Sequence, residues 1–410
     1  ALSCNHILLL DDGSSSVSLP EVPLLAVLPG TGGLTRVTDK RRVRKDLADV
    51  FCTMEEGVKA QKAQEWKLVD TITKKSNYDE VLNNIIKENV KHDNSYKNGI
   101  KLDKLSKKII NENHIKYSAL ELLIDRSKKN AKIIFNSPEI INFQNEKDIL
   151  NQGDQFWLLK CARELDDILL HLRFNELDLG VIIFSSQGSL ENILYYDSLF
   201  HKYKSSWFIN EIKYLWNRTL KRIDLTSRSL VTLIEPGSCF GGFLTEIILA
   251  SDRSYMAEGI FDETNNPEAK IALTKSNFNY FKMSNGITRL ETRFLNESVT
   301  IKKLESLINE ELDSQTALEN GLITFSFDDI DWEDEVRIFL EERSSFSPDS
   351  MTGLEANLRF AGPETMETKI FGRLTAWQNW IFQRPNAVGE NGALKKYGSG
   401  NRSKFNWERV

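Results

Sequence analysis

One carboxylate beside a glycine-rich turn is the part of this sequence best suited to acid–base chemistry. In residues 18–37, Glu21 follows Pro20, and the turn at residues 29–33 reads Pro-Gly-Thr-Gly-Gly. We expect Glu21 at the end of a strand formed by residues 16–19, just before that turn. A carboxylate placed there is partly desolvated, which suits it to proton transfer. The alternative is an exposed glutamate at a strand end with no chemical role.

Other patterns that could carry chemistry are weaker. The glycine turn is not followed by Gly-Lys-Ser/Thr, and it lacks the third glycine and later acidic residue of a dinucleotide fingerprint. The basic run at residues 40–45 favours a solvated helix face or a subunit contact over nucleic-acid binding, and a contact to a phosphate of a ligand stays open. Glu246, after Gly241 and Gly242, favours a structural helix-face salt bridge. The five histidines and four cysteines show no metal-ligand spacing, so we expect no metal.

Composition indicates an ordinary soluble chain. The 410 residues predict one or two domains with a real core. The 53 basic and 59 acidic side chains give a net charge of −6, which favours neither nucleic acid nor an anionic membrane as a partner. No apolar run is long enough for a transmembrane helix. Four widely separated cysteines predict four buried thiols and a reducing, cytoplasmic location.

Strands alternate with helices through most of the chain, which predicts an α/β architecture with crossover connections. Thr53 and Glu56 form a capping-box pattern that predicts a helix through residue 66. From about residue 335 the pattern is chiefly helical. The other expected strands lie at residues 6–10, 120–125, 131–135, 179–184 and 230–234, and the other expected helices at 40–51, 154–174 and 205–222.

An internal repeat carries more weight than any single motif. Residues 285–290 (Asn-Gly-Ile-Thr-Arg-Leu) echo residues 32–37 (Gly-Gly-Leu-Thr-Arg-Val). Residues 321–324 echo residues 67–70 at nearly the same offset, and the sequence after Glu246 continues as the chain's first residues do. The sequence therefore predicts two copies of one fold about 250 residues apart.

These segments resemble the crotonase (enoyl-CoA hydratase/isomerase) family, which pairs a Gly-Gly-x-x-Glu-Leu-Ala helix with a downstream Pro-Glu strand and a Pro-Gly-x-Gly-Gly turn. The resemblance implies an α/β fold of the ClpP/crotonase ββα spiral type in two copies, the first incomplete, plus a helical C-terminal region. We expect the following domains: residues 1–95, the C-terminal part of the first core; 96–119, a connector; 120–334, a second, degenerate core; and 335–410, the helical region.

Within the family, residues 18–49, 227–252 and 328–410 most resemble enzymes that open the ring of an oxidised benzoyl-CoA by adding water, releasing formate. The resemblance implies a CoA-thioester substrate, no cofactor, and a homo-oligomer without nucleic-acid or membrane partners. Glu21 matches the second of the family's two catalytic glutamates, and Gly30 matches the turn glycine whose N–H holds the reacting water.

The family's other catalytic glutamate would stand two residues before Ala1, so we expect the chain as given to be inactive. In the second copy Thr274 and Lys275 replace Pro-Glu, which predicts a degenerate site around Glu246. Two other hypotheses stay open. One is a generic enoyl-CoA hydratase or isomerase, and the other is a non-enzymatic scaffold.

Overall fold

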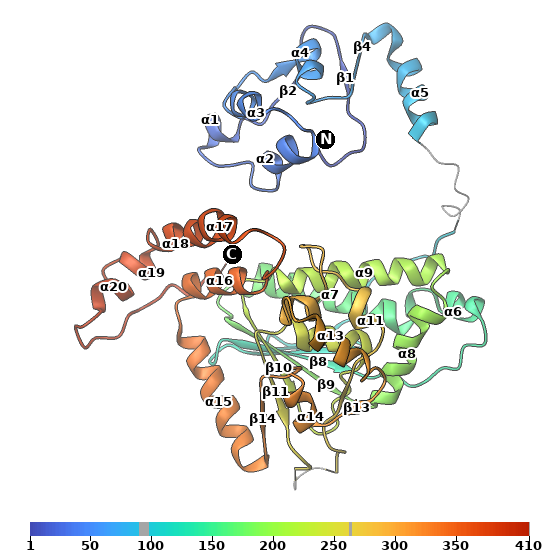
Figure 1. Ribbon diagram of the computed structural model, residues 1–410, viewed down its shortest axis with the longest axis vertical. Helices are drawn as coiled ribbons and strands as arrows, with labels where there is room; N and C mark the ends of the chain where they lie inside the picture. Colours follow the sequence, from blue (N-terminus) through green and yellow to red (C-terminus); the bar gives the residue numbers. More distant parts are fainter. Residues whose placement is uncertain (90–97, 262–264, 410) are drawn as a thin grey trace. The chain divides into compact units, whose positions relative to one another are not determined.

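A computed structural model describes residues 1–89, 98–261 and 265–409 of the chain (Figure 1). The chain divides into two compact units, Ala1–Asn98 and Gly99–Val410, called here the first and second units. The domain boundary predicted at residues 95 and 96 lies outside the described residues. The predicted connector, residues 96–119, contains two strands of the second unit's sheet and is therefore wrong as a connector.

The first unit is built from short elements around a small apolar core. Strand β1 (Leu8–Leu10) pairs in parallel with β4 (Thr71–Thr73), and β2 (Ser16–Val17) pairs antiparallel with β3 (Val58–Lys59). The helices are α1 (Glu21–Leu25), α2 (Gly33–Thr35) with the π-helical turn Arg36–Lys40, α3 (Lys45–Cys52), α4 (Ala60–Glu65) and α5 (Tyr78–Asn89). The core consists mainly of Val37, Val43, Ala48, Phe51, Cys52, Val58, Ala63, Leu68 and Val69.

Local patterns in this unit predicted its elements only in part. The expected strand at 16–19 ends at Val17, and the expected helix at 40–51 begins only at Lys45. The capping-box helix expected from Thr53 begins at Ala60 instead. The reason is the β2–β3 ladder, which requires Val58 and Lys59 in extended conformation. The two strands also come close at Gly57, where a Cβ would lie 2.4 Å from the Val17 carbonyl oxygen.

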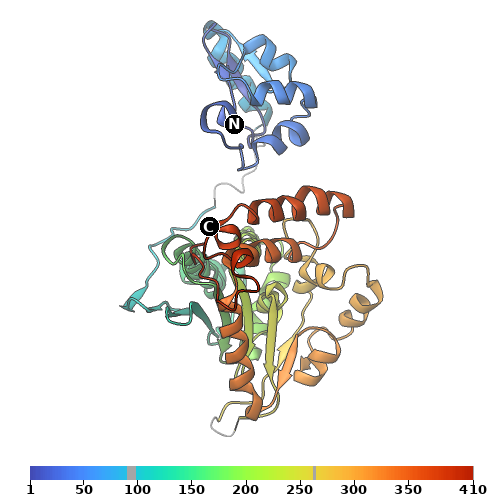
Figure 2. The ribbon, with the colours of Figure 1, turned by 90° about the vertical axis from the view of Figure 1, so that its left-hand side faces the viewer.

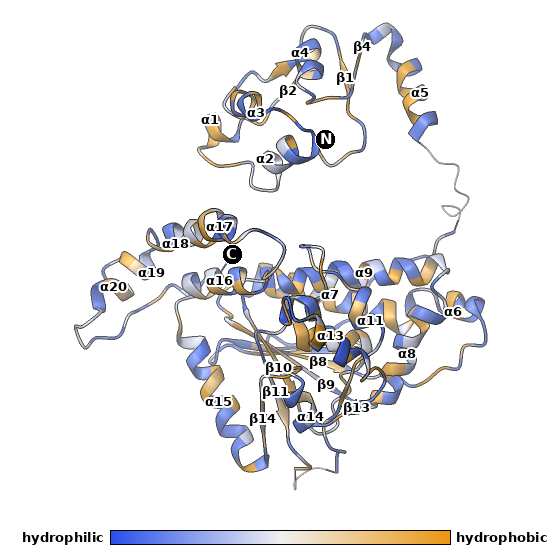
Figure 3. Ribbon diagram, in the orientation of Figure 1, coloured by the Kyte–Doolittle hydropathy of each residue, from blue (hydrophilic) through white to orange (hydrophobic). Residues whose placement is uncertain are grey.

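The second unit is organised on one sheet of eight strands in the order β14-β11-β10-β9-β8-β7-β6-β5. Strands β8, β9, β10, β11 and β14 are parallel, and β7, β6 and β5 extend the sheet as antiparallel strands. Parallel strands covered on both faces are continuously apolar, and Figure 3 shows this for the central strands. The bounds are β5 (Lys108–Asn111), β6 (His114–Lys116), β7 (Leu120–Asp125), β8 (Asn130–Asn136), β9 (Val181–Gln187), β10 (Ser229–Ile234), β11 (Arg253–Ala257) and β14 (Phe325–Phe327).

Helices cover this sheet. The long helices α7 (Trp157–Asn175) and α9 (Trp207–Asp224) pack on each other, and the indole of Trp216 donates to the Leu158 carbonyl at 2.9 Å. Helix α15 (Asp329–Ser345) contacts β9, β11 and β14 and runs alongside the strands (Figure 2). The smaller elements are α6 (Glu146–Gln152), α8 (Leu190–Lys202), α10 (Thr245–Ala250), β12 (Ile271–Ala272), α11 (Ser276–Asn279), α12 (Arg289–Arg293), α13 (Ser298–Glu305), β13 (Glu311–Leu312) and α14 (Ser314–Glu319).

The C-terminal helices belong to the second unit. Arg359, after α16, pairs with Asp252 at 2.6 Å and donates to the Arg228 carbonyl at 2.7 Å. Arg343 of α15 bonds Glu355 of α16 at 3.3 Å. The expected α/β fold with a helical C-terminal part is therefore confirmed, although that part begins with α15 at Asp329. Its further helices are α16 (Pro348–Leu358), α17 (Met366–Lys369), α18 (Thr375–Ile381), α19 (Pro385–Val388) and α20 (Ala393–Lys396).

Two segments of the chain share an order of strand pairings. In the first unit, β1 pairs in parallel with β4 and β2 antiparallel with β3. In the second unit, β11 pairs in parallel with β14 and β12 antiparallel with β13. In both segments the inner, antiparallel pair lies between the two parallel strands in the sequence.

The helices before the last strand of each segment also end alike. The Leu68 N–H donates to the Ala63 carbonyl at 2.8 Å, and the Leu322 N–H donates to the Ala317 carbonyl at 2.9 Å. The preceding residues, Lys67 and Gly321, are both left-handed, with φ of 63° and 67°. Each helix therefore needs a residue at this point that tolerates positive φ.

Gly321→Ala tests that requirement. We expect the free energy of unfolding to fall by about 1–2 kcal/mol, because a side chain disfavours the left-handed conformation. The new Cβ would also lie 3.0 Å from Phe294 Cε1. The control is Gly372→Ala, whose Cβ would meet no atom within 4 Å. Urea unfolding measures both variants, and equal stabilities would contradict the requirement.

Candidate active site

Glu21 is the first residue of α1, and its predicted place at a strand end is wrong. Strand β2 stops at Val17 because its partner β3 has only two residues, and the chain then turns into the helix at Pro20. A carboxylate in the first turn of a helix is favoured by the exposed N–H groups there. Its Oε2 atom is buried and has no hydrogen-bond partner among the described residues. Buried polar atoms without partners are uncommon and call for a functional reason.

Glu21 faces a cavity of about 430 Å³ within the first unit. Among its lining residues, Glu21 is the one carboxylate and Arg36 the one basic side chain. An unpartnered acid in a partly apolar cavity is an arrangement suited to proton transfer. The cavity is lined by Ala1, Leu2, Ser3, Ile7, Val17, Ser18, Leu19, Glu21, Pro29, Thr31, Gly33, Arg36, Phe51 and Leu68.

The glycine turn lies at this cavity, but Gly30 does not face it. Pro29, Thr31 and Gly33 are lining residues, whereas Gly30 is exposed. The Gly30 N–H donates to the Leu28 carbonyl at 2.7 Å and is therefore engaged within the turn. The structure thus brings Glu21 and the turn together, while the role of Gly30 in holding water stays a prediction.

Glu246 lies in α10 of the second unit and is 1% exposed. Its carboxylate bonds Arg289 Nη1 and the Asn277 side-chain amide, each at 2.9 Å. Arg289 also donates to Asp224 at 2.7 and 3.1 Å. Burial raises the pKa of Glu246 to about 7, although Arg289 opposes the shift. The carboxylate is thus a structural group in a helix salt bridge, as the sequence indicated, and that salt bridge is buried.

Asp197 completes this closed arrangement, and sequence reasoning missed it. Its carboxylate, 2% exposed, accepts the Phe243 backbone N–H at 2.8 Å. A Cβ on Gly242 would lie 2.4 Å from Asp197 Cγ, so the glycine is required for this contact. Asp197 comes from α8, far away in the sequence, and no local motif marks it. The second unit thus holds a further buried carboxylate against Gly242 and Phe243, a few residues before Glu246 in the sequence.

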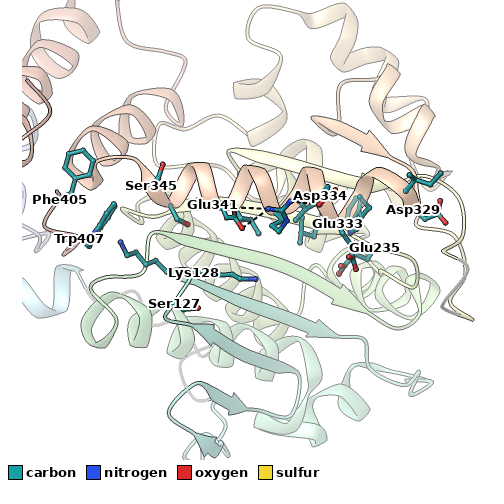
Figure 4. Close-up of a pocket in the computed structure, with 18 of the residues that line it drawn as sticks. Ser127, Lys128, Glu235, Asp329, Glu333, Asp334, Glu341, Ser345, Phe405 and Trp407 are labelled. Atoms are coloured by element: carbon teal, nitrogen blue, oxygen red, sulfur yellow. Dashed lines mark hydrogen bonds and ion pairs between the residues drawn. The ribbon is translucent and has the colours of Figure 1, made fainter. Parts of the chain in front are cut away.

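A cavity of about 1460 Å³ lies elsewhere in the second unit, between α15 and the sheet (Figure 4). Trp407 and Phe405 stand at one end of it, and Glu235 and Asp329 at the other. Arg337 lines it but is paired with Asp334 at 2.9 Å on its own helix. Charged side chains of both signs line this open groove, and none of its carboxylates has a buried oxygen without a hydrogen-bond partner. The groove is therefore a poorer catalytic candidate than the Glu21 cavity.

Other candidate sites are not supported by the described part of the chain. No group of three or more histidine, cysteine, aspartate or glutamate side chains there could hold a metal ion. No described helix is long and apolar enough to cross a membrane. All four cysteines are free thiols, but Cys4 is exposed, which corrects the expectation that all are buried.

No family model matches the sequence. A curated relative, the benzoyl-CoA-dihydrodiol lyase of Aromatoleum evansii, is 47% identical over 414 residues, covering all of this chain and 73% of that protein. The chain belongs to the benzoyl-CoA-dihydrodiol lyase family. The resemblance to ring-cleaving enzymes is thereby confirmed at the level of family.

Solved structures similar to this family member include two enoyl-CoA hydratases. One, from Bacillus anthracis, is 15% identical with a TM-score of 0.48, covering 71% of this chain and 100% of its own. The other, an enoyl-CoA hydratase/carnitine racemase from Magnetospirillum magneticum, is 12% identical with a TM-score of 0.49, covering 72% and 98%.

Asp197→Asn tests the closed arrangement in the second unit. The amide keeps an oxygen for the Phe243 N–H but cannot ionise. Burial raises the pKa of Asp197 from 3.8 to about 6, so the folded protein holds this proton more tightly than the unfolded chain. That contribution to stability is complete below about pH 4 and is lost as the pH rises through about 6.

The Tm of the unmodified protein should therefore fall relative to that of the variant across this window, by an amount equivalent to on the order of 3 kcal/mol. The control is Asp334→Asn, because the Asp334 side chain is 74% exposed. Its Tm should change with pH as the Tm of the unmodified protein does. If the Tm of Asp197→Asn also changed with pH as that of the unmodified protein does, the raised pKa of buried Asp197 would be contradicted.

Proposed function

We propose that the protein cleaves the ring of an oxidised benzoyl-CoA hydrolytically, without a cofactor. The substrate is 2,3-epoxybenzoyl-CoA or its dihydrodiol, and the products are 3,4-didehydroadipyl-CoA semialdehyde and formate. From the epoxide the atoms balance with two waters, and from the dihydrodiol with one. The reaction belongs to aerobic benzoate degradation.

The observation that carries this proposal is the buried, unpartnered Oε2 of Glu21 in a cavity of about 430 Å³. A second support is the relative whose printed name is benzoyl-CoA-dihydrodiol lyase and which matches the whole of this chain. The fold alone would not specify the reaction, because one fold carries many chemistries.

In the proposed mechanism Glu21 is a general acid–base. As base it takes a proton from water that attacks the ring, and as acid it returns a proton to the oxygen that departs. The thioester carbonyl accepts the negative charge that develops as the ring carbon–carbon bond breaks. The apolar side chains of Ile7, Leu19 and Phe51 at the cavity exclude bulk water, which strengthens the electrostatic interactions of the acid. We keep the Gly30 N–H as the proposed backbone ligand of the water, a role that requires this N–H to leave the Leu28 carbonyl and turn toward the cavity.

We also propose that the chain contains two crotonase-type copies, of which the second is degenerate. The shared order of parallel and antiparallel strand pairs supports this. So do the left-handed residues Lys67 and Gly321 at the ends of α4 and α14. The ion pair of Glu246 with Arg289 supports the degeneracy, because a carboxylate held by a buried arginine is not free for proton transfer.

The remaining expectations enter as part of the proposal. The net charge of −6 and the free thiols support a cytoplasmic enzyme without nucleic-acid partners. We propose a homo-oligomer as well, which size measurement in solution would test. A generic enoyl-CoA hydratase or isomerase is the alternative activity, and hydration of crotonyl-CoA distinguishes it from ring cleavage.

Glu21→Gln in the full-length protein tests the proposed function. We expect formate release from 2,3-epoxybenzoyl-CoA or the dihydrodiol to fall about 10²–10⁴-fold, because the amide cannot exchange a proton with water. Glu55→Gln, in an exposed side chain of the same unit, is the matched control and should keep full activity. Enzymatic assay of formate measures both.

Unchanged formate release in Glu21→Gln would exclude the proposed role of this carboxylate. Rapid hydration of crotonyl-CoA without formate release from either oxidised thioester would favour the generic hydratase instead.

A further inference from the structure

Arg36 is fixed against the glycine turn that borders the Glu21 cavity. Its Nη1 donates to the Thr31 carbonyl at 2.8 Å. The guanidinium passes directly over Gly32, where a Cβ would lie 2.3 Å from Nη1. Gly32 also has a φ of 97°, which a side chain would disfavour. The glycine at this point of the turn therefore makes room for the arginine.

The guanidinium retains donors that no described residue uses. Its one hydrogen bond to the described part of the chain is the contact with Thr31, although an arginine has five N–H donors. Arg36 and Glu21 both line the cavity, yet no ion pair joins them. A cation and an acid thus border the same space without neutralising each other, which leaves room for a ligand between them.

The second unit shows what an arginine in this sequence setting can bind. Arg289 occupies the same place in Gly-Ile-Thr-Arg-Leu that Arg36 occupies in Gly-Leu-Thr-Arg-Val. Its guanidinium holds the carboxylates of Glu246 and Asp224 at 2.7–3.1 Å. In the second unit these anions belong to the chain itself, whereas Arg36 faces an open cavity.

We propose that Arg36 is the anion-binding residue of the Glu21 cavity and receives the carboxylate that leaves the ring as formate. This inference rests on the proposed function, since ring cleavage converts one ring carbon into a carboxylate. The planar guanidinium matches two carboxylate oxygens at once, so it can hold the departing group with two parallel hydrogen bonds. Formate would also bind there from solution as a product.

The test uses the full-length protein and sodium [¹³C]formate, with binding followed by broadening of the formate NMR signal. We expect Arg36→Gln to weaken formate binding by at least about tenfold, because an amide cannot supply a charged pair of donors. The matched control is Arg44→Gln, whose side chain is 72% exposed and pairs with Asp46 outside the cavity. It should bind formate as the unmodified protein does.

Arg36→Lys separates anion recognition from support of the turn. Lysine keeps the charge and can bond the Thr31 carbonyl, but it lacks the planar pair of donors. We expect an unchanged Tm with weakened formate binding in Arg36→Lys, and no change in Arg44→Lys. If Arg36→Gln fails to fold, comparison of Arg36→Lys with Arg44→Lys still tests whether Arg36 binds the anion.

Formate that does not bind the unmodified protein, or that binds it and the Arg36 variants equally, would overturn the inference. Its failure is distinguishable from failure of the proposed function. Absence of formate release from both oxidised thioesters would overturn the function, while formate binding that depends on Arg36 would still be read directly from the NMR signal.

Discussion

Arg289 is the charge on which the second unit's arrangement depends. It is 1% exposed, and a buried charge without partners is strongly destabilising, so its guanidinium depends on carboxylate partners. Asp224 at the end of α9 and Glu246 in α10 supply them, so one side chain ties three helices together. Glu246, the carboxylate that follows Gly241 and Gly242, therefore has a structural role.

The first unit presents the opposite arrangement. Glu21 Oε2 is buried without a partner in the described chain, which costs free energy that a purely structural residue would avoid. A buried polar atom without a partner calls for an explanation, and a functional role supplies one. The contrast between a satisfied Glu246 and an unsatisfied Glu21 is the physical reason for assigning the chemistry to the first unit.

The sequence predicted the α/β class, because that class follows from a local alternation of strands and helices. A local pattern also singled out Glu21, whose chemical role stays a prediction. It placed Glu21 at a strand end, since nothing local shows that β3 is only two residues long and ends the ladder at Val17. It started a helix at Thr53, although pairing of Val58 with Val17 overrides the capping box there. The role of Asp197 could not be predicted from the sequence, because its contact with Phe243 depends on how α8 packs.

The C-terminal part shows the same limit. Helical periodicity predicted helices after residue 335, but not that Arg359 would bind Asp252 and thereby join them to the sheet unit. Side chains distant in sequence decide such contacts, and one sequence without an alignment does not reveal them.

A structure of the full-length protein with bound benzoyl-CoA, which lacks the oxidised ring carbons and cannot be cleaved, tests the central claim most directly. We expect the aromatic ring in the cavity of the first unit, with Glu21 within hydrogen-bonding reach of it or of an intervening water. A ring bound instead in the groove beneath α15, with the Glu21 cavity empty, would contradict it.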